Sequence, residues 1–183
     1  MAEPQLEPWT LRDFLAWERE QPGRYEFVDG LIVAMTGGTA VHATIKGNVF
    51  GSLRAQLRGR PCRVFSDSLK VVTDEASHYP DVAVTCSPIA PSDEQLPDPV
   101  VIVEVLSRTT SDRDRGAKWV NYRTLPSLQH YLLVASHRRR VELISRIERG
   151  WTLYILEPPD EPVTLPAIGA ELLLDEIYDD SGV

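Results

Sequence analysis

The stretch Val100-Val101-Ile102-Val103-Glu104-Val105-Leu106 decides how this chain folds, because it is an apolar run with a single carboxylate inside it. A strand that is apolar on both faces is typical of the centre of a sheet that is covered on each side. An ionised Glu104 buried in such a strand is costly unless a cation or several hydrogen bonds stabilise it. We therefore expect other groups to meet the charge of Glu104.

Three other charged residues could share that place. Asp81 directly follows a proline, Glu26 lies within an aromatic run, and Lys118 lies downstream of the central strand. Carboxylates gathered around one cation and one lysine are suited to hydrolysis assisted by a metal ion. Together these residues suggest a metal-dependent hydrolase.

Length and composition indicate one compact domain. A chain of 183 residues, of which 43% are hydrophobic and 25% charged, can bury a core without disulfides or a structural metal. No apolar run approaches the roughly 20 residues that cross a bilayer. The N-terminus does not resemble an export signal, so we expect a cytoplasmic protein without membrane contact. Cys62 and Cys86 are isolated and are expected to be reduced thiols without a catalytic role.

The net charge of −8 is unevenly distributed. Residues 151–183 hold eight acidic side chains and no basic one, whereas residues 1–150 hold 19 of each sign. We expect the acidic, Pro-rich stretch after Glu157 to be a tail bound to the surface through Leu172-Leu173-Leu174. Residues 31–66 contain basic side chains and no acidic one. This positive segment is either a phosphate-facing surface or a solvated helix face.

Local patterns in the N-terminal third predict two helices and a hairpin. Thr10 with Asp13 forms a capping box at the start of an amphipathic helix. Asp29-Gly30 joins two strand-like runs and favours a type I′ hairpin turn. Apolar residues recur at every fourth position from Ile45, which predicts a helix with one buried stripe. The expected elements are a helix over 11–21, strands over 25–28 and 31–35, and a helix over 41–58.

The rest of the chain predicts a sheet with one helical crossover. Apolar, β-branched runs predict strands over 63–65, 69–72, 82–84, 100–106, 130–135, 140–144 and 151–156. Ser111 with Asp114 forms a capping box for a helix over 112–125, and Pro126 stops this helix. The central strand, this helix and the strand over 130–135 then make a parallel βαβ unit.

The chemistry depends on whether the strands that carry Asp81 and Glu104 are neighbours. Adjacent strands lie about 4.8 Å apart, so two carboxylates at one end can reach the same ion. Mg²⁺ suits such a site, because it is typically held by one or two carboxylates plus waters and a substrate phosphate. At helical spacing Asp114, Lys118 and Tyr122 share one stripe, so Lys118 could point back at the strand end. Its ammonium could orient the attacking water or stabilise the charge on phosphorus.

Each of these residues also has a structural alternative. Asp81 could be a turn residue, Glu26 a solvent-facing residue of an edge hairpin, and His42 a structural or exposed histidine. Lys118 could form a surface pair with Asp114. Glu104 could be half of a buried ion pair with an arginine, for which the candidates are Arg108, Arg113 and Arg115.

Taken in order, the motifs of this chain resemble the Uma-type family of restriction-endonuclease-like proteins, long catalogued as a domain of unknown function. The matching residues are Tyr25-Glu26-Phe27-Val28-Asp29-Gly30, the helix with His42, Pro80-Asp81-Val82-Ala83-Val84, Val103-Glu104-Val105-Leu106-Ser107, Asp114 with Lys118 and Tyr122, and Tyr131-Leu132-Leu133-Val134. The resemblance covers one domain over residues 10–178, with tails at 1–9 and 179–183. It implies the PD-(D/E)XK nuclease fold, an α/β (α+β) fold with a mixed central sheet flanked by helices.

The resemblance also implies roles for individual residues. Asp81 and Glu104 would be the metal ligands, assisted by the backbone carbonyl of Val105, and Lys118 would be the catalytic lysine. In the general nuclease motif the lysine follows the acidic residue by two positions, where this chain has Leu106. The resemblance therefore requires the lysine to have moved to the helix. The residues expected to line the site, as further ligands or substrate contacts, are Glu26, His42 and Tyr122.

Two hypotheses of function follow. The first is a cytoplasmic, Mg²⁺-dependent endonuclease that hydrolyses phosphodiester bonds of DNA, with Mn²⁺ able to replace Mg²⁺ and no other cofactor. Many nucleases of this fold cut duplexes as dimers, because two strands need two sites, so a homodimer is expected. The alternative is a nuclease-fold module that has lost catalysis and binds nucleic acid or a protein partner.

Overall fold

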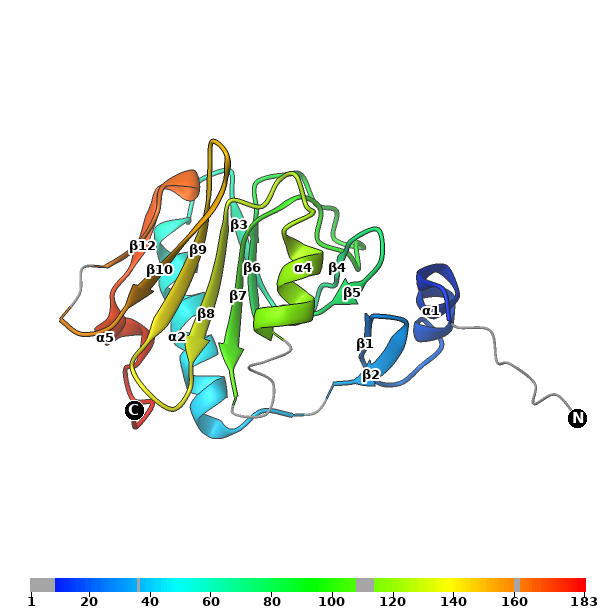
Figure 1. Cartoon of the computed structure of the whole chain (residues 1–183), viewed down its shortest axis with the longest axis horizontal. Coiled ribbons are helices and arrows are strands. Elements are labelled where there is room, and N and C mark those ends of the chain that lie inside the picture. The colour runs from blue at the N-terminus through cyan, green and yellow to red at the C-terminus, as the bar shows by residue number, and fades with distance from the viewer. Residues whose placement is uncertain (1–8, 36, 108–113, 160–161) are drawn as a thin grey trace, which may run out of the picture.

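The computed structural model describes residues 9–35, 37–107, 114–159 and 162–183. Its main body is a six-stranded sheet, and helices lie on both faces of it (Figure 1). The strands lie in the order β10 (Gly150–Leu156), β9 (Val141–Ile147), β8 (His130–Ala135), β7 (Pro99–Leu106), β6 (Val82–Thr85) and β3 (Arg63–Ser66). The expected mixed central sheet flanked by helices is confirmed. No helix in the described ranges combines the length and apolar character needed to cross a membrane.

Strand β7 is the central strand that its apolar pattern predicts. It pairs antiparallel with β6 and parallel with β8. Its valines at 101, 103 and 105 pack in one cluster with helix α2 (Ala40–Gln56), whereas Ile102 and Leu106 pack in the cluster on the opposite face. Because side chains alternate along a strand, Glu104 belongs to this second face.

The connection from β7 to β8 crosses the face that carries Glu104. Its described part is a π-helical turn, η1 (Asp114–Lys118), followed by the short helix α4 (Trp119–Tyr122). The parallel pairing of β7 with β8 confirms the predicted βαβ unit. The helix is shorter than the predicted one over 112–125, and its first turn is wider, a distortion that is frequent at functional sites. Ser111 of the expected capping box lies outside the described residues.

The N-terminal elements follow their sequence signals. Helix α1 (Leu11–Glu18) begins at Thr10, whose hydroxyl oxygen accepts a hydrogen bond from the backbone N–H of Asp13 at 3.2 Å. Strands β1 (Tyr25–Val28) and β2 (Leu31–Ala34) form the expected hairpin. Both turn residues have the left-handed backbone of a type I′ turn, with φ of 50° at Asp29 and 78° at Gly30.

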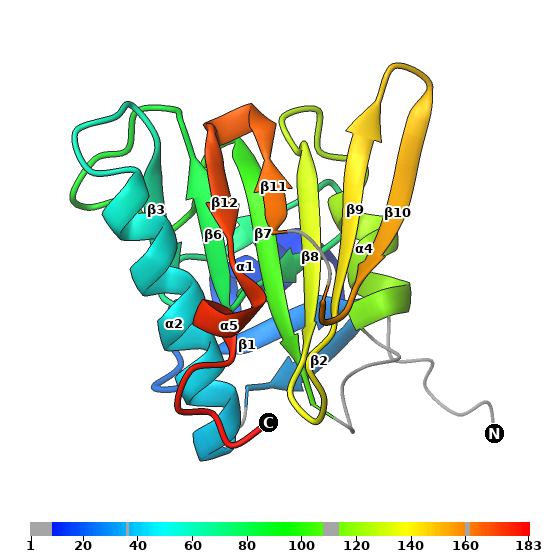
Figure 2. The same cartoon turned by 90° about the vertical axis from the view of Figure 1, so that its left-hand side faces the viewer.

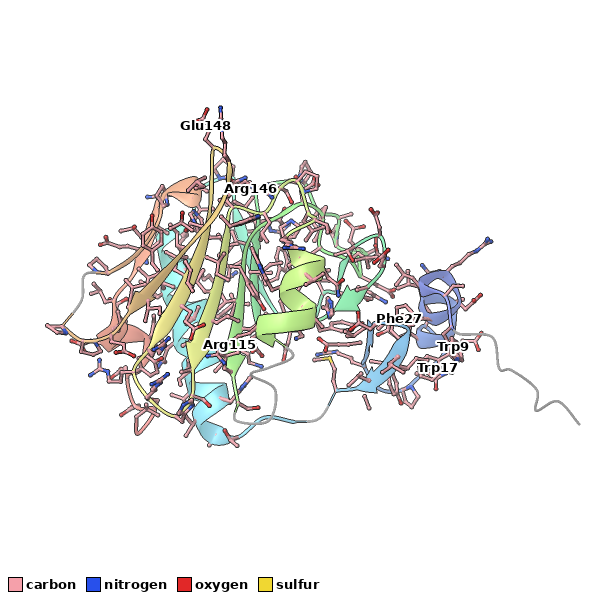
Figure 3. All side chains as sticks on the ribbon, in the orientation of Figure 1. Trp9, Trp17, Phe27, Arg115, Arg146 and Glu148 are labelled. Atoms are coloured by element: carbon pink, nitrogen blue, oxygen red, sulfur yellow. A yellow bond between two sulfur atoms is a disulfide. The ribbon has the colours of Figure 1, made fainter. Side chains whose placement is uncertain are left out.

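A second, smaller sheet contains this hairpin. Its strand order is β2-β1-β5-β4, in which β4 (Val71–Val72) and β5 (Ser77–His78) form another short antiparallel pair. Aromatic residues attach α1 to it: the rings of Phe14 and Phe27 stack at 5.2 Å, and Trp17 meets Tyr25 of β1 edge to face at 4.8 Å. Figure 3 shows Trp9, Trp17 and Phe27 gathered at this end of the molecule.

The C-terminal segment is part of the core, so the prediction of a surface tail was wrong. It forms β11 (Val163–Leu165), the 3₁₀ turn η2 (Pro166–Ile168), β12 (Ala170–Leu172) and α5 (Leu174–Ile177), which lie over the same sheet face as α2 (Figure 2). Val163, Leu165 and Leu172 are 0% exposed. The acidic side chains of this segment hid the alternation of buried and exposed residues that is typical of a strand. In β12, the exposed Glu171 stands between two buried neighbours.

The structure also corrects the prediction for the two cysteines. Cys62 and Cys86 form a disulfide, although they were expected to be reduced thiols. The physical reason is strand register. Arg63 of β3 pairs with Thr85 of β6, so the residue before β3 and the residue after β6 lie opposite each other. The two cysteines are 24 positions apart in the sequence, and this spacing does not predict that they pair.

We predict different effects for two adjacent leucines of the C-terminal segment. Leu172→Ala should lower the free energy of unfolding by about 2–5 kcal/mol, because it leaves a cavity in the core. Leu173→Ala should change it by less than about 0.5 kcal/mol, since Leu173 is 42% exposed. Urea unfolding of both variants measures the difference. Equal, small effects would show that this segment does not belong to the core.

Candidate active site

The ammonium of Lys118 lies between two buried carboxylates. Its Nζ is 3.0 Å from Glu26 Oε1 and 3.0 Å from Glu104 Oε1, and none of the three side chains is more than 5% exposed. Tyr122 donates its hydroxyl to the same Glu104 oxygen at 3.1 Å. Lys118 is thus a buried residue rather than half of a surface pair, and Glu26 does not face solvent.

The fold explains why these groups meet. Glu104 points to the sheet face over which the β7–β8 crossover returns, and parallel strands can be joined only by such a crossover. Lys118 and Tyr122 are four residues apart, so they lie on one stripe of the helical segment. Both reach Glu104, as their spacing predicts. Glu26 comes from the small sheet, so this ion pair joins the two sheets.

Hydrogen bonds add to the charge compensation. The backbone N–H of Tyr79 donates to Glu26 Oε1 at 3.2 Å. Burial, and then the charge of Glu104, raise the pKa of Tyr122 well above its usual range. Tyr122 therefore stays protonated and acts as a donor to Glu104. Lys118 and these donors together meet the two buried carboxylates.

The alternative partners of Glu104 were three arginines. Arg108 and Arg113 lie outside the described residues. Arg115 forms an ion pair with Glu142 of β9, with 2.9 Å between Nη2 and Oε1, and this contact attaches η1 to the sheet (Figure 3 labels Arg115). Hydrogen bonding from Arg115 lowers the pKa of Glu142.

Asp81 occupies the more exposed side of the site. Its Oδ2 accepts the backbone N–H of Val105 at 2.7 Å, and its Oδ1 lies 2.9 Å from His42 Nε2. The side chains of Asp81 and His42 are 15% and 19% exposed. Val82 pairs with Val103, so continuing the register by one position places Asp81 opposite Glu104. Asp81 is therefore more than a turn residue.

His42 reaches Asp81 from the first turn of α2. The side chain of Thr39 caps this helix by accepting the backbone N–H of His42 at 3.3 Å. A Cβ added at Gly38 would lie 3.0 Å from the His42 ring, so a side chain there would displace the imidazole. The cap and the glycine together hold the ring where it contacts Asp81.

The residues present fit a hard divalent cation. Asp81, Glu104 and the Val105 carbonyl are oxygen donors, which Mg²⁺ prefers. The N–H and C=O of a residue in an extended strand point to the same edge, and the N–H of Val105 points to Asp81. In the described part of the chain, no three His, Cys, Asp or Glu side chains form a ready metal cage. Mg²⁺ does not require one, because waters and a substrate phosphate complete its shell.

Sequence reasoning missed a second buried ion pair beside the first. Lys70 Nζ lies 2.7 Å from Glu18 Oε2, and both side chains are buried. Tyr79 donates its hydroxyl to Glu18 Oε1 at 2.9 Å, while its backbone N–H contacts Glu26. Burial and this contact raise the pKa of Tyr79. The available signal was Lys70 within the apolar run of residues 69–72, the same anomaly that marked Glu104.

His78 was also missed. It is 0% exposed in β5, its Nε2 lies 3.1 Å from the side-chain amide of Asn121, and its Nδ1 lies 3.9 Å from Glu26 Oε1. Its ring meets that of Tyr122 edge to face at 5.1 Å. A strand of two residues has no readable period, so no sequence pattern indicated that His78 faces the site.

Comparisons with known proteins agree with this fold. A family model described as "Putative restriction endonuclease", Uma2, matches residues 11–175. Two uncharacterized proteins of Synechocystis are relatives: slr1290 is 34% identical over 178 residues, covering 96% of this chain and 92% of its own, and sll1609 is 29% identical over 150 residues, covering 79% and 85%. A crystal structure of a putative nuclease belonging to DUF820 from Anabaena variabilis has a TM-score of 0.78 at 19% identity, over 93% of this chain and 98% of that one.

The likeness to the Anabaena structure shows a shared fold. In this chain, that fold positions the carboxylates and the lysine described above. Since the family model covers most of the chain, the protein belongs to the Uma2 family. The family expected from the sequence motifs is confirmed.

We predict that Lys118→Met destabilises the protein by about 3–5 kcal/mol, because it leaves two buried carboxylates without their cation. Lys46→Met is the matched control. Lys46 pairs with Asp67 at 2.8 Å, but these side chains are 24% and 33% exposed, so its loss should cost at most about 1 kcal/mol. Urea unfolding compares the two variants. Similar small losses would show that the Lys118 cluster does not hold the two sheets together.

Proposed function

We propose that this protein is a Mg²⁺-dependent endonuclease that hydrolyses the phosphodiester bonds of DNA. The observation that carries the proposal is the Asp81 carboxylate, which is held by the N–H of Val105 and by His42 and lies opposite Glu104 in the continued β6–β7 register. Asp81 and His42 are the more exposed members of the cluster, so a substrate would approach from their side. The description of the family as a restriction endonuclease supports the choice of reaction and of DNA.

In this proposal Asp81, Glu104 and the Val105 carbonyl hold the metal, and Mn²⁺ can replace Mg²⁺. A divalent ion bound there supplies Lewis-acid stabilisation of the charge that develops on the phosphoryl group. Asp81 directly precedes β6 and Glu104 lies in β7, so their separation is set mainly by the pairing of these two strands. Such rigid placement limits the reorganisation that the reaction requires.

The remaining residues of the site orient the metal ligands and balance negative charge. Lys118 pairs with Glu104 and holds a positive charge beside the reacting centre, where it can stabilise negative charge on the phosphate. Tyr122 and Glu26 orient Glu104 and Lys118 through the contacts described above. His42 orients the Asp81 carboxylate and is the most accessible candidate for a substrate contact.

Plasmid nicking together with calorimetry tests this function. Wild type should bind Mn²⁺ or Mg²⁺ and nick supercoiled DNA, and EDTA should abolish the nicking. Asp81→Asn retains an oxygen for the N–H of Val105 but removes the charge, so metal binding should weaken and nicking should fall by about two to three orders of magnitude. Glu148→Gln is the matched control, since Glu148 lies in the β9–β10 turn, away from the site (Figure 3).

Nicking that persists in EDTA, or that Asp81→Asn leaves unchanged, would contradict the proposal. Metal binding by wild type without cleavage would instead support the alternative, a nuclease-fold module that binds nucleic acid or a protein partner without cutting. The homodimer and the cytoplasmic location stay predictions.

A further inference from the structure

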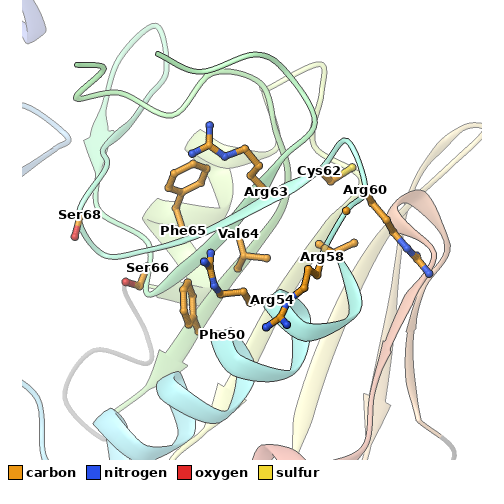
Figure 4. A pocket seen from close by; sticks show the side chains of 12 residues that line it. Phe50, Arg54, Arg58, Arg60, Cys62, Arg63, Val64, Phe65, Ser66 and Ser68 are labelled. Carbon is orange, nitrogen blue, oxygen red and sulfur yellow. The ribbon is translucent and has the colours of Figure 1, made fainter. Parts of the chain in front are cut away.

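Four arginines line one pocket at the edge of the main sheet. The pocket, of about 430 Å³, lies between the C-terminal end of α2 and strand β3 (Figure 4). No acidic residue is among those that line it. We name it the arginine groove, after Arg54, Arg58, Arg60 and Arg63.

These arginines differ from the paired cations elsewhere. Lys46, Arg115 and Arg140 each contact a carboxylate, but none of the four groove arginines forms an ion pair within the described residues. Arg60 donates to the Gly169 carbonyl at 2.8 Å and Arg63 to the Ile89 carbonyl at 3.4 Å, contacts that hold the side chains without neutralising them. Arg54 and Arg58 are exposed. Among the residues that the structure describes, no carboxylate therefore pairs with these four positive charges, although the chain has a net charge of −8.

The groove leads to the candidate active site. Ser66 and Ser68 line its near end, and Ser66 pairs with Val82, the residue after Asp81. The backbone N–H of Asp67 donates to the carbonyl of Asp81 at 3.3 Å. A strand rises about 3.4 Å per residue, so Arg63 lies about 10 Å from Ser66 along β3. A DNA strand advances about 3.4 Å per nucleotide, so the groove corresponds to about three nucleotides beyond the cleavage point.

We propose that the arginine groove binds the sugar–phosphate backbone of the substrate strand on one side of the scissile bond, independently of sequence. This inference rests on the proposed function, because it assumes a nucleic-acid substrate. Guanidinium groups match phosphate oxygens bidentately, and four of them lining one groove suit a chain of phosphates better than one small anion. The proposal takes the first of the two interpretations of the positive segment, a phosphate-facing surface.

Binding of a fluorescent 20-base-pair duplex, measured by anisotropy in EDTA across a range of NaCl concentrations, tests the inference. The Arg54→Gln/Arg58→Gln variant should weaken binding equally for unrelated sequences. The slope of log Kd against log[NaCl] should fall by about 2, one for each lost phosphate contact. Glutamine keeps part of each aliphatic stem, and the single variants Arg54→Gln and Arg58→Gln, each expected to lower the slope by about 1, serve if the double variant folds poorly.

Arg12→Gln/Arg19→Gln is the matched control, because it removes the same charge from α1, at the far end of the molecule (Figure 1). Its slope should equal that of wild type. Equal slopes for the groove and control variants, or no duplex binding by wild type, would overturn the inference. Displacement of the duplex by inorganic phosphate beyond that by NaCl of equal ionic strength would indicate a single-anion site and would also overturn it. Since EDTA prevents cleavage, a nicking failure with the expected slopes would remove the nuclease proposal alone.

Discussion

The buried ion pair of Lys118 with Glu26 and Glu104 is the constraint on which the arrangement of this protein depends. Glu104 belongs to the central strand of the main sheet, Glu26 to the hairpin of the small sheet, and Lys118 to the crossover from β7 to β8. Removing the lysine would take the shared ammonium from two buried carboxylates, which is strongly destabilising. The cluster thus fixes how two sheets, each with its own hydrogen-bonded register, meet at one edge.

The same cluster contributes to an uneven distribution of charge across the protein. Carboxylates concentrate where the two sheets meet, while the groove arginines lie along the outer edge of β3. Asp81 lies between these regions: its side chain contacts Val105 and His42, and its backbone contacts the strand end that leads to the groove. A polyanionic strand could therefore be held by the arginines while a cation between the carboxylates meets one phosphate. The acidic C-terminal segment lies over the sheet face that carries α2, and it contacts the groove through the Gly169 carbonyl, which accepts a hydrogen bond from Arg60 (Figure 2).

Most of the secondary structure was readable from sequence, because each long element has a strong local signal. The alternating, two-faced burial of β7 and the Asp29-Gly30 turn were both predicted. Failures occurred where local signal was weak or misleading: β5 has only two residues, and acidic side chains disguised the amphipathic strands β11 and β12. Of the site, the sequence indicated Asp81, Glu104, Lys118 and Tyr122 and offered Glu26 and His42 as further candidates, but it missed His78, Asn121 and the Glu18–Lys70 pair. Their role depends on contacts across 40 or more positions of the chain.

The sequence by itself determined that a carboxylate would be buried in a central strand, and that Lys118 and Tyr122 would share one face of the following helix. Both predictions follow from local periodicity, because side chains alternate every two residues along a strand and share one face about every four residues along a helix. Only the tertiary structure decided that Glu26 completes the cluster, that Cys62 meets Cys86, and that four arginines from a helix, a loop and a strand line one groove. Such pairings depend on strand register and on how the sheets pack, which no local pattern encodes.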